Sequence, residues 1–280
     1  MANHRPVPSE PDGNRAVPGI AVRLAAEFAG TLLLTFVAVG ADAAASVTGG
    51  KVTDLARAIA PALMVMAWIY AMGDRSGAHL NPAVTLAFTL RGLFPARLAP
   101  AYATAQLCGA LSGALVVRWL LGDAVAAGVT QPHGIEPATA LAIEAILTAI
   151  LVTVVLGTAD RASVVGPNAA MAVGATIALC GLVALPLEGA SMNPARSTGP
   201  AVVAGTVGDL WIYWVGPTIG AVIAVLAARL LHGPESREQE SVEAATGEGG
   251  SAVARDAARA ASGREWQGSA GPATGSTARR

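Results

Sequence analysis

The chain has 280 residues and a net charge of −1; 53% of its residues are hydrophobic and only 13% are charged. A soluble domain carries about 25% charged residues, so this sequence has too little charge to cover a water-facing surface. The near-neutral charge gives no reason to expect a nucleic-acid partner, and the two cysteines, Cys108 and Cys180, form neither a disulfide framework nor a zinc-binding spacing.

The charge deficit divides the sequence into three parts. Residues 1–19 contain four prolines and scattered charges, and residues 233–280 consist mainly of Gly, Ala, Ser, Glu and Arg. Neither end can bury enough apolar surface to offset its conformational entropy, so both are predicted to be disordered tails. Residues 20–232 form one apolar block, which is predicted to be the functional domain.

Six stretches of this block are long enough to cross a bilayer, whose hydrocarbon core of about 30 Å requires roughly 20 helical residues. They are Ile20–Gly40, Leu55–Met72, Pro100–Leu121, Ala138–Leu156, Asn168–Leu187 and Leu210–Leu231.

The basic residues predict the orientation. With both ends in the cytoplasm, the residues on that side are Arg5, Arg15, Arg23, Arg91, Arg97, Arg161, Arg229 and Arg237, whereas Lys51, Arg57 and Arg118 lie outside. This bias favours cytoplasmic termini by the positive-inside rule. The sequence therefore predicts a multi-pass protein of the cell membrane, plasma or inner, with the lipid bilayer as its environment.

Two further apolar stretches, Pro82–Leu90 and Pro194–Ala204, are too short to span. At 1.5 Å per residue each forms a helix of about 15 Å, half the hydrocarbon thickness. The triplet Asn81-Pro82-Ala83 opens the first, and Asn193-Pro194-Ala195 opens the second, 112 positions later. Two half-length helices with the same opening indicate an internal repeat.

The repeats are predicted at about 20–122 and 136–232, and each contains three spans and one half-helix. An odd number of spans gives the second repeat the opposite topology, so the half-helices enter from opposite faces and meet near the midplane. Interrupted segments at matching positions of an inverted repeat indicate a substrate path. The predicted fold class is therefore an all-α membrane protein with six transmembrane helices and two half-helices.

The triplets suit this meeting point. Asparagine is a favoured N-cap residue, and proline fits the first helical position, where its missing N–H is not needed. If each side-chain oxygen caps its own helix, the amide NH₂ of Asn81 and of Asn193 points into the channel as a donor. Both helix N-termini also present positive dipole ends there. A barrier to cations and protons follows from this arrangement.

Four ionisable residues near the triplets have candidate roles. Glu27 and Glu144 are intramembrane carboxylates at matching positions, which favours holding the loops through backbone N–H groups over proton transfer. Arg196, in the first turn of the second half-helix, is predicted to line the pore rather than to snorkel. His79 is predicted to be a hydrogen-bonded loop residue rather than a gate.

Small residues in the spans predict close helix crossings; they include Gly109, Gly113, Gly216 and Gly220.

Residues 76–85, Ser-Gly-Ala-His-Leu-Asn-Pro-Ala-Val-Thr, and 191–197, Ser-Met-Asn-Pro-Ala-Arg-Ser, resemble the two signatures of the aquaporin, or major intrinsic protein, family. The resemblance covers roughly residues 20–232. It implies an hourglass fold, homotetramers with one pore per subunit, and passive conduction of water or small uncharged solutes. No cofactor and no metal are expected.

The family's outer constriction is a filter of four residues. Counted from the triplets, its positions fall on Pro61, Gly181, Ala190 and Arg196. Water-selective members have an aromatic residue at the first position and histidine at the second, and this sequence has neither. A wide filter is therefore expected, similar to that of the solute-conducting subfamilies, which include aquaglyceroporins and plant nodulin-like members that pass metalloid acids.

Other residues favour a stricter water channel. Ser197 stands where glycerol facilitators place aspartate, and Ala201 and the pair Tyr213-Trp214 also resemble the water-channel pattern. Asp74-Arg75 departs from the family's usual pair and is interpreted as an ion pair or a tetramer contact rather than a gate.

The leading hypothesis is a passive pore for water and small neutral solutes such as glycerol or neutral metalloid acids. A strict water channel, an ion-coupled secondary transporter and a non-conducting scaffold that works through its tail are the alternatives. An enzyme is not expected, because the sequence contains no catalytic constellation or metal cluster.

Overall fold

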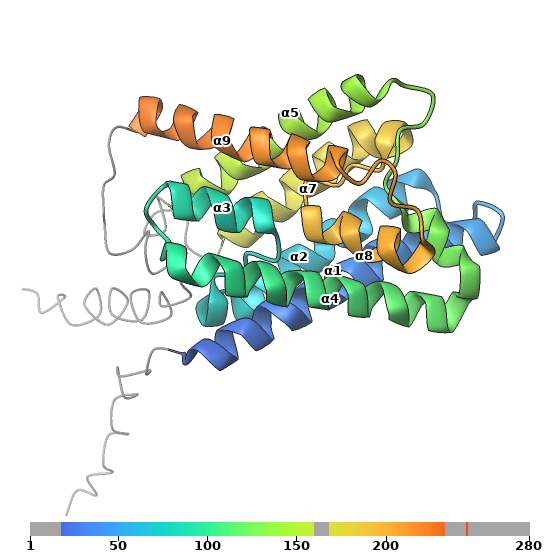
Figure 1. Cartoon of the computed structure of the whole chain (residues 1–280), viewed down its shortest axis with the longest axis horizontal. Helices are drawn as coiled ribbons and strands as arrows, with labels where there is room; N and C mark the ends of the chain where they lie inside the picture. The colour runs from blue at the N-terminus through green and yellow to red at the C-terminus, as the bar shows by residue number, and fades with distance from the viewer. Residues whose placement is uncertain (1–17, 160–167, 233–244, 246–280) are drawn as a thin grey trace, which may run out of the picture.

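The computed structural model describes residues 18–159, 168–232 and Ala245. In this part of the chain six long helices form the body of the molecule (Figure 1). They are α1 (Ile20–Val47), α2 (Asp54–Ser76), α4 (Ala99–Leu121), α5 (Pro137–Ala159), α7 (Asn168–Glu188) and α9 (Ile212–His232). Two 3₁₀ helices, η1 (Ala96–Leu98) and η2 (Gly122–Gly128), flank α4.

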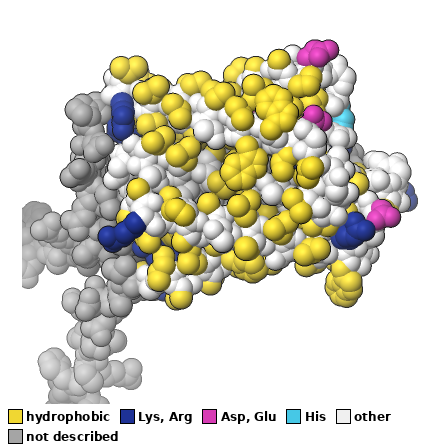
Figure 2. All heavy atoms as spheres, in the orientation of Figure 1, with side chains coloured by type: hydrophobic (Ala, Val, Ile, Leu, Met, Phe, Trp, Pro, Cys, Tyr) yellow, Lys and Arg dark blue, Asp and Glu magenta, His cyan; other side chains and the backbone are white. Residues whose placement is uncertain are grey.

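All six long helices are long and apolar enough to cross a membrane, which confirms the six predicted spans. The first helix is longer than predicted, since it continues past Gly40 to Val47. Figure 2 shows a broad band of hydrophobic side chains across the middle of the molecule, with charged side chains toward the two ends of the view. This surface suits a hydrocarbon layer bounded by water on both sides.

The two half-helices are α3 (Pro82–Leu90) and α8 (Pro194–Ala204), with the bounds predicted from the sequence. Both lie between α4 and α9 in Figure 1. The first residue of α1 and the last of α9 lie at the same end of the molecule, as an even number of spans requires. The predicted fold class, six spanning helices plus two half-helices in an inverted repeat, is confirmed.

Glycines bring the helices of each repeat into close contact. A Cβ atom on Gly109 or Gly113 of α4 would collide with the backbone of α1, at Phe28 and Leu32. In the second repeat, Gly220 of α9 faces the backbone of α5 in the same way. The interpretation of these glycines as close helix crossings is confirmed, and such crossings are typical of membrane helices.

The predicted tails lie outside the described residues, except for Pro18, Gly19 and Ala245. Arg161, assigned to the cytoplasmic side by the positive-inside rule, also lies outside them. The disorder of residues 1–19 and 233–280 and the limits of the channel domain at 20–232 stay predictions.

Candidate functional site

The first loop (residues 77–81) leads into α3, and the second loop (residues 189–193) leads into α8. The two loops share an unusual backbone. Ala78, Leu80, Ala190 and Met192 have positive φ angles of 46°, 53°, 45° and 53°. Residues with a Cβ rarely adopt this left-handed conformation, and each such residue costs about 1–3 kcal/mol. The first two recur in the second loop 112 positions later, so the strain follows the repeat. Strain of this kind persists only where surrounding groups hold it in place.

Glu27 of α1 holds the first loop. Its carboxylate accepts hydrogen bonds from the backbone N–H groups of His79 (2.9 Å) and Leu80 (2.8 Å). It also accepts from the Ser76 hydroxyl and the Gln106 amide, both at 2.7 Å. The side chain is fully buried, so all four donors find their partner within the protein.

Glu144 of α5 does the same for the second loop. It accepts from the backbone N–H groups of Ser191 (2.6 Å) and Met192 (2.8 Å). Glu188, at the end of α7, accepts from the N–H of Ala190 at 3.0 Å. Carboxylates therefore anchor both strained loops, and each binds the N–H of a residue with positive φ.

The two asparagines cap their own helices and also join the two loops. The Oδ1 of Asn81 accepts from the N–H of Ala83 at 2.8 Å, and that of Asn193 accepts from Ala195 at 3.0 Å. The Nδ2 of Asn81 donates to the carbonyl of Met192 at 2.7 Å. The Nδ2 of Asn193 donates to the carbonyl of Leu80 at 2.9 Å.

These crossed bonds change the role expected for the amides. From the sequence alone, both N–H groups of each amide are expected to be free for the channel, whereas in the structure one of them donates to the opposite loop. The left-handed backbone at Leu80 and Met192 brings the two carbonyls to the asparagines. Each NH₂ has two donors, so one N–H per asparagine remains for another partner.

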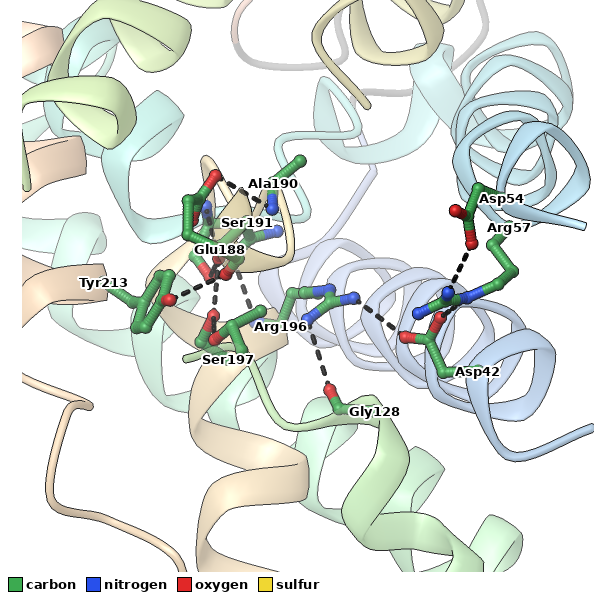
Figure 3. Close-up of polar contacts among 12 residues, drawn as sticks. Asp42, Asp54, Arg57, Gly128, Glu188, Ala190, Ser191, Arg196, Ser197 and Tyr213 are labelled. Atoms are coloured by element: carbon green, nitrogen blue, oxygen red, sulfur yellow. Dashed lines mark hydrogen bonds and ion pairs between the residues drawn. The ribbon is translucent and has the colours of Figure 1, made fainter. Parts of the chain in front are cut away.

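Arg196 lies in the first turn of α8 and is buried. Its Nη1 donates to the carbonyl of Gly128 at 3.3 Å, and its Nη2 lies 3.5 Å from a carboxylate oxygen of Asp42. Figure 3 shows the guanidinium between these two groups, which come from η2 and α1.

The other three positions of the predicted filter carry little side-chain bulk. Ala190 lies in the second loop, and Pro61 lies within α2. Gly181 of α7 faces α2, because a Cβ built on it would lie 3.1 Å from the Cβ of Ala58. Ala58 is one helical turn before Pro61, so both are on the same side of α2.

His79 lies in the first loop and is buried against aromatic side chains. Its ring stacks on Phe88 with centroids 4.8 Å apart, and its Nδ1 lies 3.1 Å from the Thr85 hydroxyl. Its Nε2 lies 2.8 Å from the carbonyl of Ala245. A carbonyl only accepts, so Nε2 carries the proton. Both ring nitrogens of His79 are therefore hydrogen-bonded, one of them to a residue of the C-terminal tail.

Residues 18–228 match the family model described as major intrinsic protein. Aquaporin NIP1-3 from Oryza sativa subsp. japonica is 43% identical over 212 residues, which cover 75% of this chain and 74% of that protein. Aquaporin NIP1-1 from Zea mays is 44% identical over 210 residues, with coverage of 75% and 74%. The X-ray structure of the aquaglyceroporin from Plasmodium falciparum matches with a TM-score of 0.69 at 25% identity, covering 76% of this chain and 97% of that chain.

The chain belongs to the major intrinsic protein family. The family resemblance inferred from the two triplets is thereby confirmed. This major intrinsic protein is a multi-pass integral membrane protein and a channel for water and small solutes. The family consists of channels, so the expectation that the chain is not an enzyme is also confirmed.

Four polar residues of this major intrinsic protein lie at the site without having been predicted there. Ser76 and Gln106 complete the hydrogen bonds around Glu27, and Glu188 holds Ala190. Asp42 faces Arg196. A signal for Asp42 was available, because a carboxylate in a spanning helix requires a hydrogen-bonding or charged partner, and Arg196 is a cation in the same apolar block.

Asp74 and Arg75 lie at the end of α2, and their nearest charged atoms are 3.8 Å apart. At this distance the two partly exposed side chains form a weak ion pair. Such pairs contribute little to stability, with a median of about 0–1 kcal/mol. A tetramer contact at this pair stays a prediction.

The bond between His79 and Ala245 predicts an effect of the tail on permeation. Ala245 is fully buried and packs in a cluster with side chains that include Val84, Phe88 and Tyr102. Ending the chain at His232 removes Ala245 from its contacts with His79 and α3. We expect this removal to open the path beside α3, so the osmotic water permeability of proteoliposomes should rise. A chain ending at Ser262, which keeps Ala245, is the control and should conduct like the full chain. Equal permeability of all three would contradict the prediction.

Proposed function

We propose that this major intrinsic protein passively conducts water and small uncharged solutes of the size of glycerol or of a neutral metalloid acid. The opposed half-helices are the observation that carries the proposal. Asn81 and Asn193 meet at their N-termini, and each retains one amide N–H for a permeant oxygen. Two positive helix ends at one level oppose cations and turn the water molecules, which interrupts proton relay.

The composition of the proposed filter supports solutes larger than water. The proposed filter of Pro61, Gly181, Ala190 and Arg196 contains no aromatic side chain and no histidine. Relatives named aquaporin NIP and a solved aquaglyceroporin resemble the chain over about three quarters of its length. The aquaglyceroporin's name supports a polyol such as glycerol as a test solute.

The assembly and orientation are part of the same proposal. We infer a homotetramer in the cell membrane with both termini in the cytoplasm, because the family resemblance implies the first and the arginine distribution favours the second. The start of α1 and the last turn of α9 lie on the same side of the molecule (Figure 1), which is compatible with this orientation.

Stopped-flow light scattering on proteoliposomes tests the function. Shrinkage in an impermeant osmolyte measures water flux, and reswelling in glycerol measures solute flux. Both rates should exceed those of empty liposomes. Rates equal to empty liposomes for both the full chain and the chain ending at His232 would overturn the proposal. Fast water flux without glycerol flux would favour the strict water channel, which Ser197 and Tyr213-Trp214 support.

An ion-coupled transporter requires a titratable group that faces its substrate. Glu27 and Glu144 were the candidates, and both use their carboxylate oxygens to bind loop N–H groups. This engagement supports a passive pore. Uptake that depends on a pH gradient and is lost in Glu27→Gln would favour the transporter instead.

Gly181→His should narrow the filter from the α7 side. Glycerol flux is expected to fall by about tenfold, or ~1.4 kcal/mol on the barrier, with water flux reduced by less than about twofold. Gly181→Ala is the matched control, since its Cβ requires only a small shift of Ala58. Equal loss of both fluxes, or no change in either, would show that position 181 is not in the filter.

A further inference from the structure

Asp42 lies near the C-terminal end of α1, and its carboxylate is shared by two arginines. One oxygen lies 2.7 Å from Nε of Arg57, and the other lies 3.5 Å from Nη2 of Arg196. The Asp42 side chain is 6% exposed and that of Arg196 is 8% exposed. Figure 3 shows Asp42 between the two guanidinium groups. Both charges of the Asp42–Arg196 pair are therefore withdrawn from bulk water.

The pair belongs to a longer row of charges. Arg57 also binds Asp54 at 2.7 Å, and the Asp54 side chain is 64% exposed. From the surface inward, the row reads Asp54, Arg57, Asp42, Arg196, with alternating signs and no net charge. Each buried charge therefore faces an opposite one, as burial in a low-dielectric region requires.

The Asp42 end of this row determines where the Arg196 guanidinium lies. One of its nitrogens is directed at the Gly128 carbonyl and another at Asp42. Both contacts draw the group toward α1 and η2. Without the carboxylate, a buried guanidinium would turn its unpaired donors toward the nearest water, which in this proposed channel is the filter itself.

We propose that Asp42 is a specificity-determining positioning residue for the filter: it draws Arg196 toward α1 and neutralises its charge, and so admits solutes with the cross-section of a small polyol. This inference rests on the proposed function. It adds an α1 residue to a filter that the family resemblance builds from α2, α7 and the second loop. Arg57 moderates the effect, since it holds the same carboxylate at the shorter distance.

Asp42→Asn is the direct test. Asparagine keeps the shape and can still accept from Arg57, but it has no charge and turns an NH₂ group toward Arg196. Glycerol flux in proteoliposomes should fall by about tenfold, or ~1.4 kcal/mol on the barrier, and water flux by less than about twofold. Asp42→Glu keeps the charge and should restore part of the glycerol flux.

Asp54→Asn is the matched control. It removes a carboxylate from the same row, but one that is exposed and contacts Arg57 rather than Arg196. Its glycerol-to-water ratio should equal that of the wild type. A similar fall in Asp54→Asn and Asp42→Asn would overturn the specific role of Asp42.

A double substitution separates positioning from general stability. In an Arg196→Ala background, Asp42→Asn should leave the glycerol-to-water ratio unchanged, because the group that Asp42 positions is gone. A further fall there would overturn the proposal. If Asp42→Asn does not fold, Arg57→Gln tests the same idea with the opposite sign: it frees Asp42 for Arg196 and should raise the ratio. A lower ratio would overturn the proposal.

The same measurements distinguish this inference from the proposed function. Wild-type glycerol flux at the level of empty liposomes would overturn the proposed solute class. Water flux then tests Asp42, because Arg196 would turn into a filter that is already narrow and Asp42→Asn should slow water. Unchanged water flux in that case would overturn the role of Asp42.

Discussion

Glu27→Ala is expected to abolish water permeation and to lower the thermal stability of the purified protein. The substitution removes the acceptor of four hydrogen bonds, two of them from the backbone of His79 and Leu80. Each buried donor left without a partner costs about 1–3 kcal/mol. Leu80 also has a strained left-handed conformation, which lasts only while its N–H is held.

Loss of the Glu27 carboxylate also affects Asn193 in the second repeat. The Leu80 carbonyl accepts the amide N–H of Asn193, so a displaced first loop leaves both asparagines misplaced. Glu27→Gln should have a weaker effect than Glu27→Ala, because one acceptor oxygen remains. The measurements are proteoliposome shrinkage at equal protein density and thermal unfolding in detergent.

Glu136→Ala is the control for the loss of a glutamate, since Glu136 is exposed before α5. Its permeability and unfolding temperature should match the wild type. Wild-type shrinkage rates in Glu27→Ala would show that the loop keeps its conformation without the carboxylate.

The helices and their repeat were predictable from the sequence because their signals are local. Hydrophobic length gives the spans, and Asn followed by Pro gives the start of a half-helix. Pro82–Leu90 and Pro194–Ala204 were predicted with the bounds that the structure has. The glycines of α4 and α9 were interpretable because only a residue without a side chain allows two helix backbones to touch.

The parts that were not predicted depend on contacts between distant segments. The crossed bonds of Asn81 and Asn193 require left-handed backbone at Leu80 and Met192, where no glycine signals it. Asp42 and Arg196 are far apart in the sequence, and only the packing of α1 near α8 brings them together. Charge in an apolar span indicates that a partner exists, but not which residue it is.

Gly109→Ala is expected to prevent correct packing of α1 on α4. The added Cβ would collide with the backbone carbonyl of Phe28 and lie 3.0 Å from the backbone nitrogen of Leu32. Backbone atoms cannot rotate away as a side-chain tip can, so the two helices would have to separate. Overpacking by one methyl group costs about 1–3 kcal/mol, and the shift would also move Glu27, one residue before Phe28.

Gly157→Ala provides the matched comparison, because the chemical change is the same and no atom of the described residues lies within 4 Å of the added Cβ. Gly157 lies within α5, where alanine favours the helix by roughly 0.5–1 kcal/mol, so this variant should unfold at an equal or higher temperature. Gly109→Ala should unfold at a lower temperature and yield less folded protein in size-exclusion chromatography.

Gly220→Ala should behave like Gly109→Ala, because its Cβ would meet the Ala145 carbonyl at the equivalent crossing of the second repeat. Equal unfolding temperatures for the Gly109 and Gly157 variants would mean that α1 and α4 can separate without cost, and the close crossing would then not be what fixes Glu27 beside the first loop.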